Sequence, residues 1–471
     1  MFMPESANGD SCPVLLDKSA LSWITLFLVK FAKPVAAPPE EAAQPRRRHP
    51  KPTGYKLYTV EEVAQHNSPD DAWLIIEDKI FDVSAMEHPG GDVIFSYAGR
   101  DASELFNVMH KNQPRARAML KAHLIGGVLQ PQRTALLRDW DAMRTKFHDT
   151  GLMDASPLYY TRKIVELLAM ISTSLYLLYC HNTSPLAMLA SSLLMAMFMF
   201  QCGWTQHDFL HNQVFRSHQW NAFVGGLVIS LGLGGSSHWW KSKHNQHHAT
   251  PNKMSADNTQ AVDPDIDTVP LIAWSEALLK QVNLPDRGLI MLQHIITWPL
   301  LLVALVNWQA QSFIHCLSVP NIPAKQRRWE IGTMLVHHAI INVSIFYCLG
   351  LRQGLVYWLI AHCAAGFGTS FVFIQSHNAM EIYTDDKDFV TSQMVSTRNI
   401  NPGLLADWLM GGLNYQIEHH LFPTMPRHSF SRVRRDIMEF CARHNLPYES
   451  CSIWEATAKV YRQLACVAKM A

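Results

Sequence analysis

Two long stretches without Asp, Glu, Lys or Arg constrain this chain more than any other feature of its sequence. The first covers residues 167–206, and the second covers residues 331–380, where Arg352 is the only such residue. A helix needs about 20 apolar residues to cross a bilayer, so each stretch has room for two crossings. We therefore expect two membrane-spanning hairpins and four spans in total.

Turn-like segments divide the two stretches. The sequence His-Asn-Thr-Ser-Pro at 181–185 predicts a turn in the first, and Arg-Gln-Gly at 352–354 predicts a turn in the second. The expected spans are 164–180, 185–204, 331–350 and 354–374.

A third uncharged stretch, at 289–324, is interrupted by polar residues such as Gln293 and Asn307. Basic residues that flank membrane helices are expected on one side of the bilayer. A full span here would put the basic segment 325–328 on the opposite side from Lys241. We therefore expect residues 289–311 to lie in the membrane interface or to dip into it.

Composition excludes several classes of function. The net charge is +1 and 17% of residues are charged, so the chain lacks the basic surface that nucleic acid binding requires. Nine cysteines without a Cys-x-x-Cys pair argue against a disulfide scaffold, a thiolate zinc site and an iron–sulfur cluster. The unusual number is 24 histidines, seven of them between residues 201 and 250. Clustered imidazoles favour a metal site.

A candidate heme site lies in the polar segment before the first hairpin. His88 is followed by Pro-Gly-Gly, and His110 follows 22 residues later. One histidine fills one axial position of a heme iron, so a facing pair predicts a centre for electron transfer. Expected strands at 72–76 and 80–83 and helical stretches at 92–98 and 102–109 surround the two histidines. This part of the chain resembles cytochrome b5 over most of 55–128, and that resemblance implies that His88 and His110 are the axial ligands of heme b.

Three histidine boxes form a second set of candidate ligands. Box one is His-Asp-Phe-Leu-His at 207–211, box two is His-Asn-Gln-His-His at 244–248, and box three is Gln-Ile-Glu-His-His at 416–420. Residues separated by three or four positions share one face of a helix, so each box presents its donors toward one point. Seven histidines and one glutamine exceed the roughly four ligands of a mononuclear zinc site and suggest two metal ions, with imidazole donors that suit iron. The candidate ligands are His207, His211, His244, His247, His248, Gln416, His419 and His420, and His377 at the end of the fourth expected span is added to them.

The remaining histidines and the box carboxylates have weaker claims. His337 and His338 lie inside an expected span without a third donor, so neutral packing or a water contact is favoured over metal binding. His218, His238 and His294 either orient a ligand or have surface and packing roles. Asp208 and Glu418 lie inside boxes, and the sequence does not decide whether they hydrogen-bond a ligand imidazole or bind metal.

The boxes, the paired hairpins and the fused heme segment together resemble the membrane front-end fatty acyl desaturases over about 55–445. Residues 239–252, 263–268 and 414–427 look like that family, and Gln416 in place of a leading histidine is its mark. Within it the chain most resembles Δ6 acyl desaturases, although Δ5, Δ4 and sphingolipid Δ8 enzymes share the same boxes. The resemblance implies two non-heme iron ions that activate O2 and remove hydrogen from two adjacent methylene carbons, inserting a double bond on the carboxyl side of an existing one.

Further expectations concern the electron supply, the substrate and the compartment. We expect electrons from NADH through NADH–cytochrome b5 reductase, since no Gly-x-Gly-x-x-Gly fingerprint follows a strand. The substrate would be a fatty acyl chain carried as a CoA or phospholipid ester, held in an apolar tunnel. Candidates for its lining are Trp239, Trp240, Phe367, Phe371 and Phe373. The protein is expected in the endoplasmic reticulum membrane, with the heme domain and the metal site facing the cytosol.

The expected fold class is an α+β cytochrome b5-like heme domain fused to an all-α membrane domain with two hairpins and a cytosolic helical cap over the diiron site. The expected divisions are 1–52 as a disordered or linker tail, 53–130 as the heme domain, 131–160 as a tether, 161–445 as the membrane desaturase domain and 446–471 as a C-terminal tail. Two alternative functions stay open: a diiron hydroxylase, which Gln416 disfavours, and a membrane-anchored cytochrome that only carries electrons.

Overall fold

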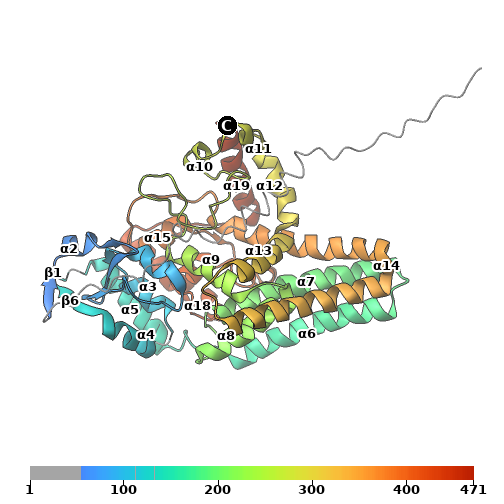
Figure 1. Cartoon of the computed structure of the whole chain (residues 1–471), viewed down its shortest axis with the longest axis horizontal. Coiled ribbons are helices and arrows are strands. Elements are labelled where there is room, and N and C mark those ends of the chain that lie inside the picture. The colour runs from blue at the N-terminus through green and yellow to red at the C-terminus, as the bar shows by residue number, and fades with distance from the viewer. Residues whose placement is uncertain (1–54, 112, 132) are drawn as a thin grey trace, which may run out of the picture.

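The computed structural model describes residues 55–471 except 112 and 132. The tail expected at 1–52 lies outside these residues. Figure 1 shows the small N-terminal domain at one end of the molecule and the long apolar helices at the other, with the remaining helices between them.

The N-terminal domain is built on a mixed sheet with the strand order β1-β6-β4-β3-β2, and β5 pairs with β3. Alternating apolar residues in β3 and β4 fill the core beneath the sheet, where Ala72, Leu74 and Val83 are buried. Of the candidate heme ligands, His88 lies in the loop between β4 and η1, and His110 directly follows α3. The elements are β1 (Lys56–Tyr58), α2 (Val60–Ala64), β2 (Asn67–Ser68), β3 (Asp71–Ile76), β4 (Lys79–Asp82), η1 (Gly91–Tyr97), β5 (Arg100–Asp101), α3 (Ser103–Met109), α4 (Gln113–Leu120), η2 (Lys121–His123) and β6 (Leu124–Val128).

Three helices among the described residues are long and apolar enough to cross a membrane: α6 (Pro157–Cys180), α7 (Pro185–Leu210) and α14 (Ala324–His377). Ser156 and Ser184 cap α6 and α7, and each cap is followed by a proline that suits the first turn of a helix. Both helices pack against α14, and Tyr357 of α14 contacts Ser174 and Ser191 at the centre of the contact. Figure 1 shows these long helices side by side.

Helix α14 consists of two arms that meet at Gly350. The sequence placed this turn at 352–354, but the break falls at Gly350, whose φ of 66° is readily adopted only by glycine. Phe346 of the first arm lies against Gly354 of the second, so the two arms fold back on one another. The predicted hairpin is therefore present, with its turn slightly earlier than expected.

Residues 289–311 fall largely in α12 (Gln293–Leu302) and α13 (Ala304–Ser318), which meet at Val303 with a bend of 70°. Taken together the pair is long and apolar enough for a span, but the bend gives it the form of a broken or re-entrant segment. Ile295 and Leu302 of α12 are exposed, as is Met291 just before the helix, while Thr297 of α12 is buried.

The remaining elements surround the ends of the long helices. They are α5 (Ala135–Asp149), α8 (His218–Leu227), the π-helix η3 (Val228–Leu233), α9 (Ser237–Ala249), α10 (Glu276–Lys280), η4 (Leu284–Asp286), α11 (Arg287–Ile290), α15 (Phe389–Ser396), β7 (Asn399–Ile400), α16 (Leu404–Leu409), α17 (Gln416–Leu421), η5 (Arg427–Ser429), α18 (Phe430–His444), β8 (Ser450–Cys451) and α19 (Ile453–Ala468).

Two segments expected as connections are packed into the body of the protein. In the expected tether, α5 buries Trp140 and Phe147 in one core with residues of α15, α17 and α18. In the expected C-terminal tail, α19 buries Ala456, Val460 and Leu464, four residues apart, along one face. Both helices are amphipathic, and burial of that apolar face holds each of them in place.

Candidate metal centre and heme pocket

Four helix segments bring the histidine boxes to one place. Box one lies in the last turn of α7 and box two in the second half of α9, while His377 ends α14 and box three forms α17. The structure thus brings together all nine residues predicted as non-heme metal ligands. Their donor atoms form two groups, in each of which the histidine nitrogens lie within 4.8 Å of one another.

The larger group contains five histidines from all three boxes. The Nε2 atoms of His207 and His244 are 3.2 Å apart, and those of His244 and His248 are 3.1 Å apart. His419 of box three reaches the Nε2 of His248 at 3.1 Å. His211 completes the group, and its ring contacts His244 and His419.

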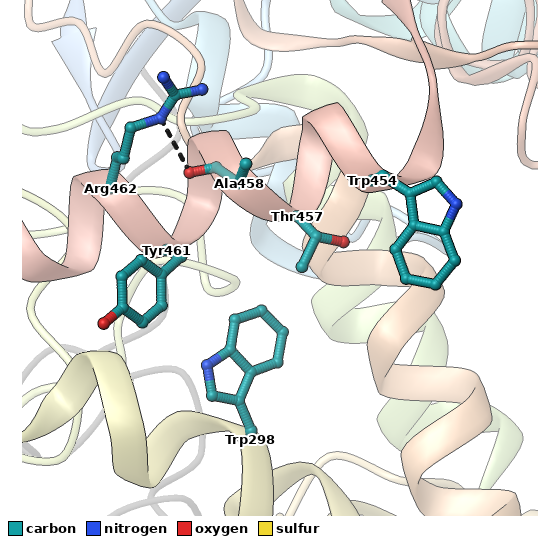
Figure 2. A pocket seen from close by; sticks show the side chains of 6 residues that line it. All are labelled: Trp298, Trp454, Thr457, Ala458, Tyr461 and Arg462. Carbon is teal, nitrogen blue, oxygen red and sulfur yellow. Dashed lines mark hydrogen bonds between the residues drawn. The ribbon is translucent and has the colours of Figure 1, made fainter.

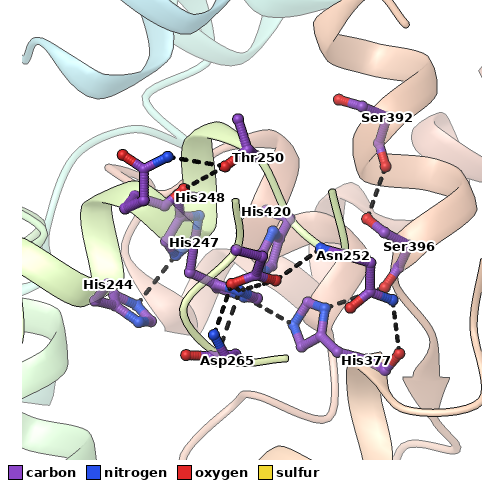
Figure 3. A network of polar contacts seen from close by, with 12 residues as sticks. His244, His247, His248, Thr250, Asn252, Asp265, His377, Ser392, Ser396 and His420 are labelled. Atoms are coloured by element: carbon purple, nitrogen blue, oxygen red, sulfur yellow. Dashed lines mark hydrogen bonds and ion pairs between the residues drawn. The ribbon is translucent and has the colours of Figure 1, made fainter. Parts of the chain in front are cut away.

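The smaller group contains His247, His377 and His420. The Nε2 atoms of His247 and His377 are 3.3 Å apart, and the side-chain nitrogen of Gln416 lies 2.9 Å from the Nε2 of His377. Figure 3 shows His247 and His377 joined in this way, with His420 beside them. His377 therefore lies with the box residues, as the sequence predicted.

The spacing and the unpaired atoms of both groups fit bound metal ions. Imidazole nitrogens bind metals at about 2.1 Å, so two of them on one ion at a right or tetrahedral angle are about 3.0–3.4 Å apart. The Nε2 separations of 3.1–3.3 Å lie in that range. Among the described residues, the Nε2 atoms of His211 and His420 and the Oε1 of Gln416 are buried without a hydrogen-bond partner. Buried atoms of this kind are costly unless an ion or water satisfies them.

Hydrogen bonds on the opposite side of the rings orient several of these histidines. The Nδ1 of His377 lies 3.1 Å from the carbonyl oxygen of Ser396, and the Nδ1 of His420 lies 2.8 Å from Oε1 of Gln393. A ring that donates through Nδ1 keeps the lone pair of Nε2 free for a metal. Trp240 adds a stacking contact to His244, with ring centroids 4.2 Å apart.

The charge environment differs between the two groups. Burial holds the pKa values of His248 and His419 well below the usual range, helped by neighbouring histidines, so both rings are neutral donors. Burial by itself lowers the pKa of His247. The nearby carboxylates of Asp263 and Asp265 outweigh this effect and raise the pKa of His247 to about 9. Its Nδ1 lies 3.0 Å from the buried carboxylate of Asp263. Asp263 thus lies within hydrogen-bonding distance of a ring of the smaller group, whereas Asp208 lies 4.0 Å from the Nδ1 of His207 in the larger group.

The two carboxylates inside the boxes bind other partners. Asp208 forms a buried ion pair with Arg427 at 2.6 Å. Glu418 accepts hydrogen bonds from Asn399 at 2.8 Å and from the hydroxyl of Tyr448 at 2.5 Å. The sequence left two roles open for these carboxylates, a hydrogen bond to a ligand imidazole and binding to a metal. These contacts correspond to neither role.

The other histidines lie outside both groups. The Nδ1 of His337 contacts the carbonyl oxygen of Leu231 at 2.8 Å, in agreement with the favoured packing role. His238 contacts His315 at 2.8 Å, and His294 packs against Tyr461. Burial lowers the pKa of His218, and the charges of Lys241 and His110 lower it further.

The candidate heme ligands face one another in the N-terminal domain. The ring centroids of His88 and His110 are 6.0 Å apart, a separation that accommodates one metal ion bound to a nitrogen of each ring at about 2 Å. The Nδ1 of His110 lies 2.9 Å from the carbonyl oxygen of Phe106, which leaves Nε2 for the metal. Burial, together with the charge of His110, lowers the pKa of His88 to about 4, so its ring is neutral. At Gly90 a Cβ would come within 2.8 Å of the His88 ring, so only glycine fits beside this ligand.

A groove of about 580 Å³ lies away from these groups, between α12 and α19. Figure 2 shows Trp298 facing Tyr461 and Thr457 across it, with Trp454 and Arg462 at its ends. None of the lining residues belongs to the histidine groups. Among the aromatic residues proposed for the acyl tunnel, Phe371 contacts the groove residue Trp298, with ring centroids 6.5 Å apart, and stacks on Phe367 in α14. Phe373 packs against Trp204.

Sequence reasoning missed the residues that support the ligands. Asp263 lies in a stretch recognised as family-like, yet its contact with His247 could not be assigned. Gln393 was not noticed, although it contacts His420 and also donates to the carbonyl of His248 at 3.2 Å. Neither residue has a characteristic spacing from a box, because each reaches its partner only through the tertiary fold.

Comparison with known proteins agrees with this geometry. Residues 183–452 match the family described as fatty acid desaturase, and residues 59–129 match the cytochrome b5-like heme/steroid binding domain. An acyl-lipid (9-3)-desaturase of Physcomitrium patens is 40% identical over 437 residues, which are 92% of this chain and 82% of the relative. A Delta(8)-fatty-acid desaturase of Euglena gracilis is 32% identical and covers 82% of this chain and 92% of its own length. A Delta(5) fatty acid desaturase of Caenorhabditis elegans is 31% identical, with coverages of 80% and 90%.

Proposed function

Because the chain belongs to the cytochrome b5-fused, front-end branch of the fatty acid desaturase family, we propose that it inserts a cis double bond at the Δ6 position of a polyunsaturated acyl chain. The expected oxidoreductase class and the kinship to front-end desaturases are confirmed by these matches. The Δ6 position rests on the resemblance of the sequence, and relatives named for Δ8 and Δ5 make those positions the alternatives to be tested.

One observation carries the proposal: eight histidines and one glutamine from four distant segments converge in two adjacent groups. We assign one iron ion to each group, the first to His207, His211, His244, His248 and His419, the second to His247, His377, His420 and Gln416. Iron bound at these positions would activate O2. Activated O2 is needed because the methylene carbons that lose hydrogen are themselves unreactive. The donor set is almost entirely neutral imidazole, which suits iron.

The residues of the chain itself hold this centre rigid and separate it from bulk water. Six of the eight histidines have less than 4% of their surface exposed. Their Nδ1 contacts with Asp263, Ser396 and Gln393 fix ring orientation, and fixed geometry is needed to select one carbon pair among chemically similar methylenes. Trp239, Trp240, Phe367, Phe371 and Phe373 stay our candidates for the acyl path.

The N-terminal domain would hold heme b between His88 and His110 and pass electrons to the iron pair. Each turnover needs two electrons, which we assign to NADH through NADH–cytochrome b5 reductase. The facing imidazoles and the neutral state of His88 support this role.

We further propose four spans, formed by α6, α7 and the two arms of α14, in the endoplasmic reticulum membrane. The heme domain and the iron pair would lie on the cytosolic side. The exposed apolar residues Ile295 and Leu302 of α12, with Met291 just before it, support a position of α12 at the membrane interface. We keep the domain divisions at 53–130, 131–160, 161–445 and 446–471 as our proposal. Within them, α5 of the tether and α19 of the C-terminal tail pack against the rest of the protein.

Feeding experiments would test the position of the new double bond. The chain is expressed in yeast supplied with 18:2, 18:3, 20:3 and 22:5 acids, and products are identified by gas chromatography. We expect Δ6 products from the C18 acids. Products carrying only new Δ5, Δ4 or Δ8 bonds would refute the Δ6 assignment while keeping the front-end class, and separating CoA esters from phospholipids at early times would identify the acyl carrier.

Metal analysis would test the iron centre. We expect two non-heme irons per heme in the active protein, whereas a cytochrome that only carries electrons has heme iron alone. His419→Ala should abolish desaturation and lower the non-heme iron content with an unchanged heme spectrum, and the exposed His181→Ala is the control. Full activity in His419→Ala would remove His419 from the ligand set.

A further inference from the structure

The heme domain touches the helical domain beside each of the three histidine boxes. Next to His110, the ammonium group of Lys111 donates a hydrogen bond of 2.9 Å to the carbonyl oxygen of Gln213, two residues after box one. On the other side of His110, the carbonyl oxygen of Val108 accepts a hydrogen bond of 3.0 Å from the hydroxyl of Thr424, four residues after box three.

The third contact reaches box two itself. Ser96 lies in η1, the helical turn that follows the His88 loop, and its hydroxyl exchanges hydrogen bonds of 2.9 and 3.1 Å with the side-chain amide of Gln246. Gln246 lies in α9 between His244 and His247. The segments that carry the two heme ligands are therefore tied to the segments that carry the metal ligands.

Apolar burial and a charge pair accompany these hydrogen bonds. Val108 is 3% exposed and belongs to the same core as Trp140, Ile417 and Phe422, while Ala249 of α9 is buried in the core of the heme domain. Arg100 of the heme domain forms an ion pair of 2.8 Å with Asp386. A surface that shares its cores with the neighbouring domain resembles the interior of one protein rather than a transient contact.

We propose that Ser96, Lys111 and Thr424 are positioning residues that keep the heme domain docked on the three histidine boxes throughout turnover. The inference rests on the desaturase function proposed above and deepens it. Electron transfer would take place between two domains that stay in contact, without a tethered heme domain having to bind and dissociate in each turnover. In that step one electron would pass from heme held by His88 and His110 to iron held by the histidine boxes, so that the heme would be oxidised and the non-heme iron reduced. No bond forms or breaks at the three residues, and NADH resupplies the electron through its reductase.

Docking itself can be tested with a cysteine pair in the full-length protein. Ser96→Cys with Gln246→Cys joins two positions whose side chains touch, and a short bis-maleimide, which forms a thioether with each thiol, should link them in most molecules, as peptide mass analysis would detect. The control pair is Lys79→Cys with Gln246→Cys, since Lys79 is an exposed residue of β4. Equally low yields from both pairs would overturn the docked arrangement. This conclusion would hold whether or not the protein contains iron.

The electron step can be tested by stopped-flow spectroscopy of the heme. The triple variant Ser96→Ala, Lys111→Met, Thr424→Val removes the four side-chain hydrogen bonds. Ser68→Ala with Lys79→Met changes exposed residues of β2 and β4 as a control. After anaerobic reduction, mixing with O2 and acyl substrate should reoxidise the heme at least about tenfold more slowly in the triple variant. The ferric heme spectrum and midpoint potential should equal those of the control.

A small diffusible reductant separates positioning from damage to the metal site. It needs no docked heme, so desaturation driven by it should run at the control rate in the triple variant. Heme reoxidation at the control rate would overturn the proposal. If the triple variant is unstable, Ser96→Ala with Thr424→Val is expected to slow reoxidation in the same direction. Failure of the unaltered protein to desaturate any acid would refute the proposed function instead, and the cross-linking yield would still decide the docking.

Discussion

The ion pair between Asp208 and Arg427 offers the sharpest test of how box one is built. Arg427 Nε lies 2.6 Å from Asp208 Oδ2. Asp208 is 2% exposed and Arg427 is 5% exposed. Arg427 also donates to the carbonyl oxygen of Gly411 at 2.9 Å. Asp208 is the neighbour of His207, so its carboxylate is either a metal ligand or a structural partner of Arg427, and the geometry favours the second.

The cost of breaking the pair follows from its burial. Removing one partner of a buried ion pair leaves the other charge without compensation and costs about 3–5 kcal/mol. Asp208→Asn should therefore lower the free energy of unfolding by about that amount. At 2–4 °C per kcal/mol for a domain of 150–250 residues, the expected decrease in midpoint temperature is roughly 6–20 °C. Replacing both partners, as in Asp208→Leu with Arg427→Met, should recover most of the loss because no charge stays buried.

The assay compares thermal unfolding with iron content in the purified protein. For Asp208→Asn we expect a clear loss of thermal stability but unchanged non-heme iron per folded molecule, and for His207→Ala we expect lower iron content. The reasoning would be refuted if Asp208→Asn lost iron while its unfolding temperature stayed the same, since that result would make Asp208 a ligand. A double variant no more stable than Asp208→Asn would refute the ion-pair energetics.

Three further predictions concern stability. Burial raises the pKa of Glu104 to about 7, with a further increase from Asp101 that Arg133 partly offsets. Stability linked to this group is therefore present below about pH 4.5 and lost as pH rises through about 7. The stability of Glu104→Gln relative to the unaltered protein should therefore rise by up to about 3 kcal/mol between pH 4.5 and pH 8, as thermal unfolding at both pH values would check. Gly411→Ala should cost about 2–5 kcal/mol in chemical denaturation, because φ is 59° and the added Cβ would meet the ring of Trp204; a neutral result would contradict this. Tyr357→Phe should cost only about 1 kcal/mol, because hydrogen bonds between membrane helices are weak; a loss of several kcal/mol would show that the hydroxyl does more than join Ser174 and Ser191.

The apolar helices could be predicted because their signal is local and repeated over many residues. Their ends were less certain. Helix α7 continues to Leu210, beyond the expected end at 204, because its last turn is buried and a polar box can stay helical there. Likewise, the turn of α14 falls at Gly350 and not at the polar segment 352–354 that follows it. Gly350 is the residue inside α14 whose backbone leaves the helical conformation, and its positive φ favours glycine.

The donors within each box could be predicted from helical spacing, whereas their supporting contacts could not. His244 and His248 are four residues apart on α9, so their approach follows from the sequence alone. The approach of His419 to His248, by contrast, depends on how α17 packs against α9. The same limit applies to Asp208, because its partner Arg427 lies more than two hundred residues away and the sequence contains nothing that pairs them.

The placement of the carboxylates makes the two metal positions unequal. In the group of His207, His211, His244, His248 and His419, the neighbouring Asp208 is neutralised by Arg427. In the smaller group, Asp263 lies against the ring of His247, so negative charge reaches that position through a ligand imidazole. A carboxylate behind an imidazole makes it a stronger donor. The iron that we propose at His247, His377, His420 and Gln416 should therefore be the more electron-rich of the two, and Gln416, a neutral side chain, would add no further charge at that position.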